Sequence, residues 1–212
     1  MFALFGITCQ YGYMGDGRQK TDFAEERDGF RFRGGCNAID LPATLQARLK
    51  PAPRELLGTP GDLARWLRAA GLAACLPETT EADLATAHAL REAIYALANG
   101  LRTGNDDTAA RVVLNRIASG APAVPQLLPN GGGVHLDGSA DALLVTLARE
   151  AITLLGGEDA GHIRQCESPT CTLLFIDTSR KGTRRWCSMS ACGTRAKVAE
   201  FRRRKRTSLP DM

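Results

Sequence analysis

The chain has 212 residues, 44% of them hydrophobic, which allows one ordinary domain with a small appendage. No apolar run is long enough to span a membrane, and the first residues lack the basic start and cleavage site of a signal peptide. Seven cysteines without a framework pattern also argue against a secreted disulfide scaffold. We therefore expect a protein of the reducing cytoplasm with no membrane contact.

Charge is divided unevenly along the chain. Residues 1–163 hold 15 Lys and Arg against 19 Asp and Glu, whereas residues 164–212 hold 12 against 4. A mildly acidic body followed by a concentrated basic segment is typical of a chain that meets a polyanion at one end. The alternative is a solvated basic tail that has no fixed partner.

The N-terminal part begins without a clear pattern. Residues 1–29 are rich in glycine and charge, and we expect an irregular arm there. Residues 30–32 alternate Phe with Arg, which suits a short strand turned by Gly34-Gly35. Asp40 is a good N-cap, so a helix is expected from there to about residue 49, where a pair of prolines breaks it.

Apolar periodicity predicts four further helices in the body. They are expected at about residues 60–70, 81–99, 107–118 and 140–155, and residues 124–128 and 134–136 are expected to form a hairpin. In the fourth helix of the body, Val112, Val113, Leu114 and Ile117 are expected to face the core. The sequence thus predicts a mainly α-helical domain over residues 30–157, followed by a linker over residues 158–162.

Three polar side chains of the body could bind a ligand or have a purely structural role. Arg91 lies at the edge of an apolar stripe, where it would either anchor a ligand or pair with an acid such as Asp40. We expect His88 to be a packed histidine and His135, on the hairpin, to be exposed.

Four cysteines form two Cys-x4-Cys pairs separated by fifteen residues, Cys166 with Cys171 and Cys187 with Cys192. A tetrahedral zinc ion takes four soft donors from two such turns, as in a zinc ribbon or treble-clef finger. Four thiolates leave no position open for water, so the pattern predicts a structural Zn²⁺ site and not a catalytic one. Buried structural cysteines, a redox disulfide pair and His162 as a substitute ligand are the alternatives, and iron is the competing metal.

The finger is expected over residues 163–206, with a tail over residues 207–212. A strand at residues 173–176 and a loop at residues 177–182 precede a basic helix from about residue 194 to residue 206. At 100° per residue, Val198 and Phe201 share a side that we expect to pack on the cysteine turns. Arg195, Arg202 and Arg206 form a stripe beside it, which is either a binding surface or an ordinary solvated helix face.

The segment Arg184-Arg185-Trp186-Cys187-Ser-Met-Ser-Ala-Cys192-Gly193-Thr194-Arg195 resembles the CGNR zinc-finger proteins, bacterial stress-induced transcription regulators with an N-terminal ABATE domain. The body also resembles that domain, through Phe32-Arg-Gly34-Gly35, Asp40, Thr44, Leu63, Trp66-Leu67 and Leu90-Arg91-Glu92-Ala93. Two positions depart from the family pattern: Thr194 replaces the Asn of Cys-Gly-Asn-Arg, and Ala43 replaces the Asn of an Asn-Thr pair. Threonine can still cap a helix N-terminus.

The resemblance implies a transcription regulator whose body senses a small-molecule effector or mediates homodimerisation, and whose zinc finger binds double-stranded DNA. The residues expected to contact DNA are Arg180, Lys181, Arg184, Arg185, Arg195, Lys197, Arg202, Arg203 and Arg206. The residues expected to bind an effector are Gly34, Gly35, Asp40, Thr44, Arg48 and Arg91.

Two other classes of function stand beside that one. The first is a protein–protein interaction module whose finger docks an acidic partner without binding DNA. The second is an enzyme, which we do not expect, because the sequence holds no Ser/His/Asp arrangement, no P-loop and no dinucleotide fingerprint.

Overall fold

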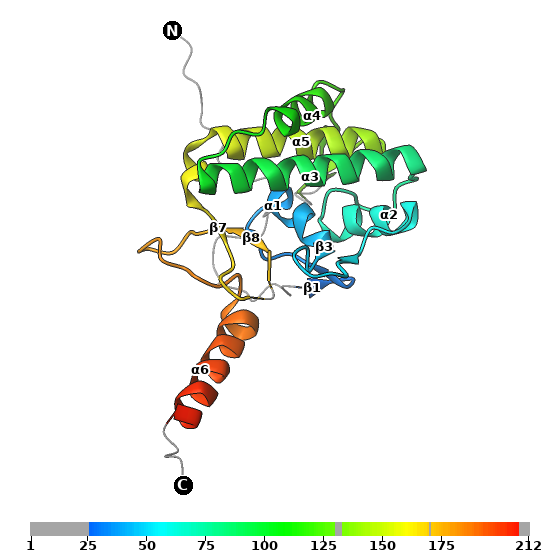
Figure 1. The fold of residues 1–212 in the computed structure, drawn as a ribbon. Coiled ribbons are helices and arrows are strands. Elements are labelled where there is room, and N and C mark those ends of the chain that lie inside the picture. The colour runs from blue at the N-terminus through cyan, green and yellow to red at the C-terminus, as the bar shows by residue number, and fades with distance from the viewer. Residues whose placement is uncertain (1–25, 130–132, 170, 208–212) are drawn as a thin grey trace.

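The structure is a computed structural model that describes residues 26–129, 133–169 and 171–207, with side chains up to residue 204 in the last helix. Most of the predicted arm (1–25) and of the predicted tail (208–212) lies outside these ranges. Three long helices pack against one another, with two shorter ones beneath them (Figure 1). The long helices are α3 (Glu81–Thr103), α4 (Thr108–Ala118) and α5 (Ala140–Gly156), and the short ones are α1 (Asn37–Asp40) and α2 (Pro60–Ala69). A sixth helix, α6 (Thr194–Thr207), projects away from this body.

The strands of the described ranges form four small antiparallel pairs. They are β1 (Glu26–Arg27) with β2 (Phe30–Arg31), β3 (Leu45–Gln46) with β4 (Arg54–Glu55), β5 (Val124–Leu127) with β6 (Val134–Asp137), and β7 (Ile163–Gln165) with β8 (Leu174–Ile176). The expected hairpin after α4 is therefore confirmed. So is the predicted fold class, mainly α-helical with a finger and a final helix. None of the helices in the described residues is both long and apolar enough to cross a membrane.

Local sequence explains where the helices begin and where α3 ends. Thr59 and Thr80 each form a capping box with the aspartate three residues later, which satisfies backbone N–H groups that have no partner inside the helix. Helix α3 continues past residue 99, where the sequence predicted its end before Gly100, and ends at Gly104 with φ of 77°. A Cβ on Gly100 would lie 2.4 Å from the carbonyl oxygen of Asn105, so this glycine permits close packing of the following loop and does not end the helix.

The helix predicted over residues 40–49 is wrong. Helix α1 spans Asn37–Asp40 and a 3-10 turn, η1 (Leu41–Thr44), follows it, so Asp40 lies inside the helical segment instead of capping it. The Asp40 carboxylate accepts a hydrogen bond from the backbone N–H of Gly34 at 2.6 Å. Beyond η1 the chain is extended, because β3 pairs with β4, and it turns at Ala47 with φ of 54°.

Helix α4 buries a narrower face than the sequence predicted. Ala110, Leu114 and Ala118 are buried at four-residue spacing, whereas the side chain of Val112 is exposed. Val113 and Ile117 are half-buried. Because α4 lies on the outside of the helical layer, only one stripe of its side chains reaches α3 and α5.

The hydrophobic core continues from the helical body into the finger. Leu174 and Ile176 of β8 belong to the cluster that contains Trp66, while Phe175 between them packs with the cysteines. Alternate side chains of a strand point to opposite sides, so β8 forms a wall shared by the two regions. The segment predicted as a linker forms a 3-10 turn, η3 (Glu158–His162), that leads directly into β7.

Candidate metal centre and basic surface

The four cysteines of the finger come together at one point. Their sulfur atoms all lie within 4.8 Å of one another, with Cys171 to Cys187 at 3.9 Å and Cys187 to Cys192 at 3.6 Å. Tetrahedral thiolates around zinc lie about 3.8 Å apart, given a Zn–S distance of about 2.3 Å. Cys166, Cys187 and Cys192 are buried and Cys171 is half-buried, so the cluster is closed and suited to hold a structural zinc ion.

Backbone hydrogen bonds shape the two turns that carry the cysteines. In the first turn, the Cys171 N–H donates to the Ser168 carbonyl at 2.9 Å, and in the second the Gly193 N–H donates to the Ser188 carbonyl at 3.0 Å. The turns are also joined, because the Glu167 N–H donates to the Arg185 carbonyl at 3.0 Å. Both sulfur pairs are therefore positioned by short-range backbone contacts.

The thiols strongly influence one another's protonation. Hydrogen bonds from Cys171 and Cys187 lower the pKa of Cys166 well below its usual range. The hydrogen bond to Cys166 raises the pKa of Cys171 to about 11, and the same partner raises the pKa of Cys187. Four thiolates around one point need a cation between them, and a soft divalent ion such as Zn²⁺ offsets two of their four negative charges.

Two arginines support the cysteines from outside the cluster. Arg195, in the first turn of α6, donates to the sulfur of Cys192 at 3.0 Å. The guanidinium of Arg184 lies 4.5 Å from the centre of the Phe175 ring and donates to the carbonyl oxygens of Trp186, at 2.9 Å, and Cys187. Arg184, one of the expected DNA contacts, is thus directed into the finger itself.

Helix α6 begins in an unexpected way. A single π-helical turn, η4 (Met189–Gly193), precedes it, and the hydroxyl of Ser188 caps that turn by accepting from the Ala191 N–H at 3.4 Å. Thr194 is therefore inside a continuous helical segment, and its hydroxyl donates to the Met189 carbonyl at 3.0 Å. Thr194 therefore does not cap the helix, because the cap lies six residues earlier, at Ser188.

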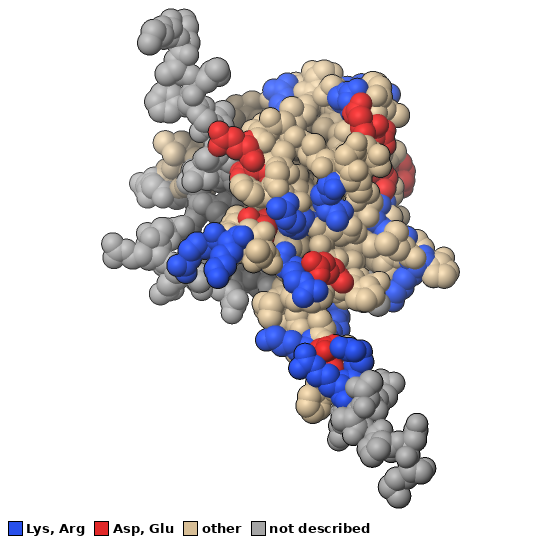
Figure 2. All heavy atoms as spheres, turned by 60° about the vertical axis from the view of Figure 1, so that its left-hand side comes forward, with Lys and Arg blue, Asp and Glu red and all other residues tan. Residues whose placement is uncertain are grey.

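Helix α6 carries most of its charge into solvent. Figure 2 shows Lys and Arg gathered over the projecting helix. Glu200 is the one acidic residue in the sequence of this helix. Val198 and Phe201 are 43% and 68% exposed, so the expectation that they pack on the cysteine turns is wrong. The reason is the direction of α6, which leaves the finger after its first turn.

The loop between the cysteine pairs presents further positive charge. Asp177 holds the loop, since its carboxylate accepts from the backbone N–H groups of Ser179 at 2.9 Å and Arg184 at 2.8 Å. Arg180 and Lys181 are exposed at its tip. The loop is thus a basic projection held at its base by a buried carboxylate.

The other expected DNA contacts differ in whether an acidic side chain pairs with them. Arg185 pairs with Glu167 at 2.6 Å and Arg203 with Glu200 at 2.8 Å, both on the surface. Lys197 and Arg202 are exposed and have no ion-pair partner among the described side chains. Surface ion pairs contribute about 0–1 kcal/mol, so they exchange readily for another anion. The side chain of Arg206 lies outside the described residues.

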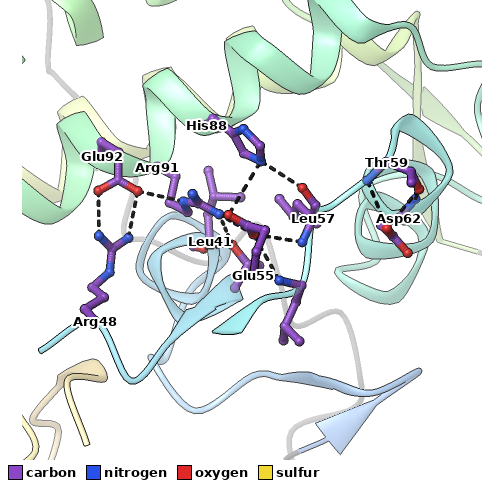
Figure 3. A network of polar contacts seen from close by, with 11 residues as sticks. Leu41, Arg48, Glu55, Leu57, Thr59, Asp62, His88, Arg91 and Glu92 are labelled. Atoms are coloured by element: carbon purple, nitrogen blue, oxygen red, sulfur yellow. Dashed lines mark hydrogen bonds and ion pairs between the residues drawn. The ribbon is translucent and has the colours of Figure 1, made fainter. Parts of the chain in front are cut away.

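Arg48 and Arg91, both expected at an effector site, form one polar network with Glu55 and Glu92 (Figure 3). Thr44, expected at the same site, joins the network through Arg91. Arg91 is buried and donates to Glu55 at 2.6 Å, Glu92 at 2.8 Å and the Thr44 hydroxyl at 3.3 Å. Arg48 forms a bidentate pair with Glu92 at 2.5 and 3.1 Å. Arg91 therefore pairs with acids, as one interpretation held, but its partners are Glu55 and Glu92 and not Asp40.

The two glutamates are the residues of this network that the sequence did not reveal. Burial raises the pKa of Glu55, but hydrogen bonds from Arg91 and the Leu57 N–H more than offset this, and the pKa lies below its usual value. Glu92 follows Arg91 in the segment Leu90-Arg91-Glu92-Ala93, which resembles the ABATE domain, so the sequence offered a reason to consider it. Glu55 is 36 residues away from Arg91, so no local pattern could identify it.

Gly34, Gly35 and Asp40 lie where the body meets the finger. A Cβ on Gly34 would lie 2.6 Å from the Cγ2 of Ile39, so only glycine fits against α1. Burial raises the pKa of Asp40 to about 7, although the Gly34 N–H opposes the shift. Gly35 packs beside Ile176 of β8 with φ of 98°. The six expected effector residues thus fall into two groups whose described polar contacts are with the protein itself.

The histidines do not join the cysteine cluster. His162 is exposed, with its Nδ1 3.5 Å from Asp159, and it is not part of the four-sulfur group. His88 packs as expected, with its Nε2 2.9 Å from the Leu57 carbonyl oxygen. His135 is half-buried, whereas we expected an exposed side chain.

Two family models match this chain, one after the other along the sequence. Residues 37–158 match the model of ABATE, whose description is "Putative stress-induced transcription regulator". Residues 162–205 match the model of the CGNR zinc finger. Among curated proteins, none matches the chain. The first match covers the helical body, and the second covers the four cysteines and most of α6.

Proposed function

This chain belongs to the ABATE family and carries a CGNR zinc finger after that domain, and from this premise we propose that it is a transcription regulator that binds double-stranded DNA through the finger. The observation that carries the proposal is the projection of α6 from the body with basic side chains exposed on it. A helix that stands clear of its own protein has room to lie in a major groove, and α-helices are the elements that this groove admits.

We assign different roles to the basic residues according to their surroundings. Arg202 is the candidate for a groove contact, because it is exposed on the stripe that also holds Ala199, a small residue that permits close approach. The exposed residues around it and at the loop tip are candidates for phosphate contacts: Arg180, Lys181, Arg185, Lys197 and Arg203. Arg184 packs inside the finger, and Arg195 donates a hydrogen bond to a sulfur of the cysteine cluster.

One finger supplies few base contacts, so we propose that two chains act together on DNA. A homodimer would present two copies of α6, and the spacing of its half-sites would follow from the separation of the two helices. Light scattering of the zinc-loaded protein, alone and with DNA, measures this directly. A monomer in both conditions would contradict the dimer and leave the finger to bind singly.

The test of DNA binding is fluorescence anisotropy of a labelled duplex with the zinc-loaded, full-length protein across a salt series. If about five phosphates are neutralised, the logarithm of the association constant falls with the logarithm of salt concentration with a slope of about −4 to −5. Arg202→Gln is expected to weaken binding, whereas Arg116→Gln, an exposed arginine of α4, is the matched control and is expected to leave it unchanged. Binding that is insensitive to salt, or equally weak in both variants, would contradict the proposal.

The second candidate is a protein-interaction module in which the finger docks an acidic partner. The exposed Phe201 favours it, because a large aromatic side chain on a basic helix suits an amphipathic protein contact. Absence of DNA binding at low salt, with the metal shown to be present, would favour this candidate. Neither proposal involves catalysis, since the two matched families are a regulator and a zinc finger.

A further inference from the structure

A pocket of about 200 Å³ lies between the helical body and the finger. The body contributes Arg31 from β2 and Lys50 from the turn after β3, and the finger contributes Cys171, Thr172 and Arg195. The pocket thus touches one cysteine of the metal centre and the first turn of α6. It lies apart from the Arg48–Glu92 and Arg91–Glu55 pairs described above, none of whose residues lines it.

The lining of this pocket is rich in basic side chains. Three cations line it, Arg31, Lys50 and Arg195, and none of its lining residues in the described part of the chain is acidic. Arg31 and Lys50 have no ion-pair partner within the described residues. Arg195 donates a hydrogen bond to the Cys192 sulfur, so its charge is offset in part by the cysteine centre, whose four thiolates and one Zn²⁺ carry a net charge of about −2. The charges of Arg31 and Lys50 remain to attract an anion of matching size.

We propose that this pocket binds the phosphate group of a small molecule, held by Arg31, Lys50 and Arg195. A phosphate carries about −1.5 to −2 charges near neutral pH, which suits three cations better than a single carboxylate does. Guanidinium groups bind its oxygens in a bidentate manner, and the hydroxyl of Thr172 adds a further donor. The volume is below the roughly 300–1,000 Å³ of pockets for larger ligands, so the ligand is inorganic phosphate or a small phosphorylated compound.

The position of Arg195 gives the site a regulatory consequence, which rests on the proposed function. The same guanidinium faces the pocket and the Cys192 thiolate, and its backbone forms the first turn of α6. A phosphate that binds Arg195 would therefore act on the helix proposed to contact DNA. By linkage, any change in DNA affinity caused by phosphate is matched by an equal change in phosphate affinity caused by DNA.

The binding test is a calorimetric titration of the zinc-loaded, full-length protein with inorganic phosphate and with glycerol phosphate at constant ionic strength. We expect saturable binding by the native chain and a loss of about tenfold or more in Lys50→Gln, the loss of one charge-assisted hydrogen bond. Lys50 is exposed, so its replacement leaves the fold intact. Arg116→Gln removes the same charge far from the pocket and is expected to bind like the native chain. No saturable binding, or equal losses in both variants, would overturn the site.

A DNA titration with the same variants distinguishes the source of the phosphate. If the ligand is a free small molecule, Lys50→Gln leaves DNA affinity unchanged when phosphate is absent, and abolishes the effect of added phosphate. If Lys50→Gln instead weakens DNA binding directly and free phosphate competes with DNA, the pocket takes a backbone phosphate and the small-molecule proposal fails. Saturable phosphate binding by a protein that binds no DNA would keep the site and refute the proposed function.

Discussion

The backbone N–H of Ile176 donates a hydrogen bond to the carbonyl oxygen of Gly34 at 2.8 Å. This bond joins β8 of the finger to the segment before α1 of the body. On either side of Phe175, the side chains of Leu174 and Ile176 are buried in the body's core, while Phe175 packs with the cysteines. The metal centre and the helical body therefore share one strand, and the loss of order in either affects the other.

Removal of the metal is expected to destabilise the whole described protein, because β8 cannot keep its position once the cysteine turns open. Exposure of Leu174 and Ile176 alone would cost roughly 3–6 kcal/mol. A strong chelator should thus lower the unfolding temperature of the helices, measured by circular dichroism at the helix band. An unchanged helical transition in protein shown to be free of metal would contradict this coupling.

Arg184→Lys is expected to weaken the finger, while Arg185→Lys serves as the matched control. Arg184 uses its planar guanidinium on Phe175 and on two carbonyl oxygens, which a lysine cannot reproduce, whereas Arg185 is exposed and pairs with Glu167. We expect a loss of about 1–3 kcal/mol and faster release of zinc to a colorimetric chelator for the first variant only. Equal behaviour of the two lysine variants would remove the structural role assigned to Arg184.

Asp40→Asn is expected to change how stability depends on pH. Burial raises the pKa of Asp40 to about 7, so the folded protein favours the protonated form, and the stability it contributes is lost as pH rises from about 4 to about 7. The loss amounts to roughly 4 kcal/mol at most. The charged groups that act on this carboxyl are Arg27, which lowers its pKa, and Glu150, which raises it.

The asparagine variant keeps the oxygen that accepts from Gly34 but has no proton to lose. Its stability relative to the native chain should therefore be higher at pH 8 than at pH 4, as measured by denaturant unfolding at both values. Asp141→Asn changes an exposed carboxyl of α5 and is the control for the loss of one carboxyl group. A constant difference between Asp40→Asn and the native chain at the two pH values would show that Asp40 stays ionised in the folded protein.

Glu55→Ala is expected to destabilise the body by about 3 kcal/mol, because it removes the closest carboxylate from the buried Arg91 guanidinium. The backbone N–H of Leu57 loses its acceptor as well, whereas that of Leu56 keeps the Thr44 carbonyl oxygen. Glu78→Ala, at an exposed position, is the control and is expected to change stability by less than about 0.5 kcal/mol. Denaturant unfolding at neutral pH measures both. A loss as small as that of the control would mean that Glu92 and Thr44 suffice to hold Arg91.

Several features of this protein could be predicted because they depend on short stretches of chain. Capping residues and the spacing of apolar residues predicted the starts of α2, α3, α4 and α5 to within about one residue. The spacing of the cysteines indicated which four sulfur atoms come together. The extended segment after α1 was missed, because pairing with β4 outweighs the local helical signal.

Only the tertiary structure decided the relationships between distant segments. It brings Glu55 to Arg91 across 36 residues and places Ile176 on the carbonyl of Gly34. It also directs Arg184 into the finger while α6 extends into solvent, and it closes a basic pocket from β2, the turn after β3 and the finger. Sequence spacing determines which residues share one helix face or one turn. Which element each face packs against depends on how the whole chain folds.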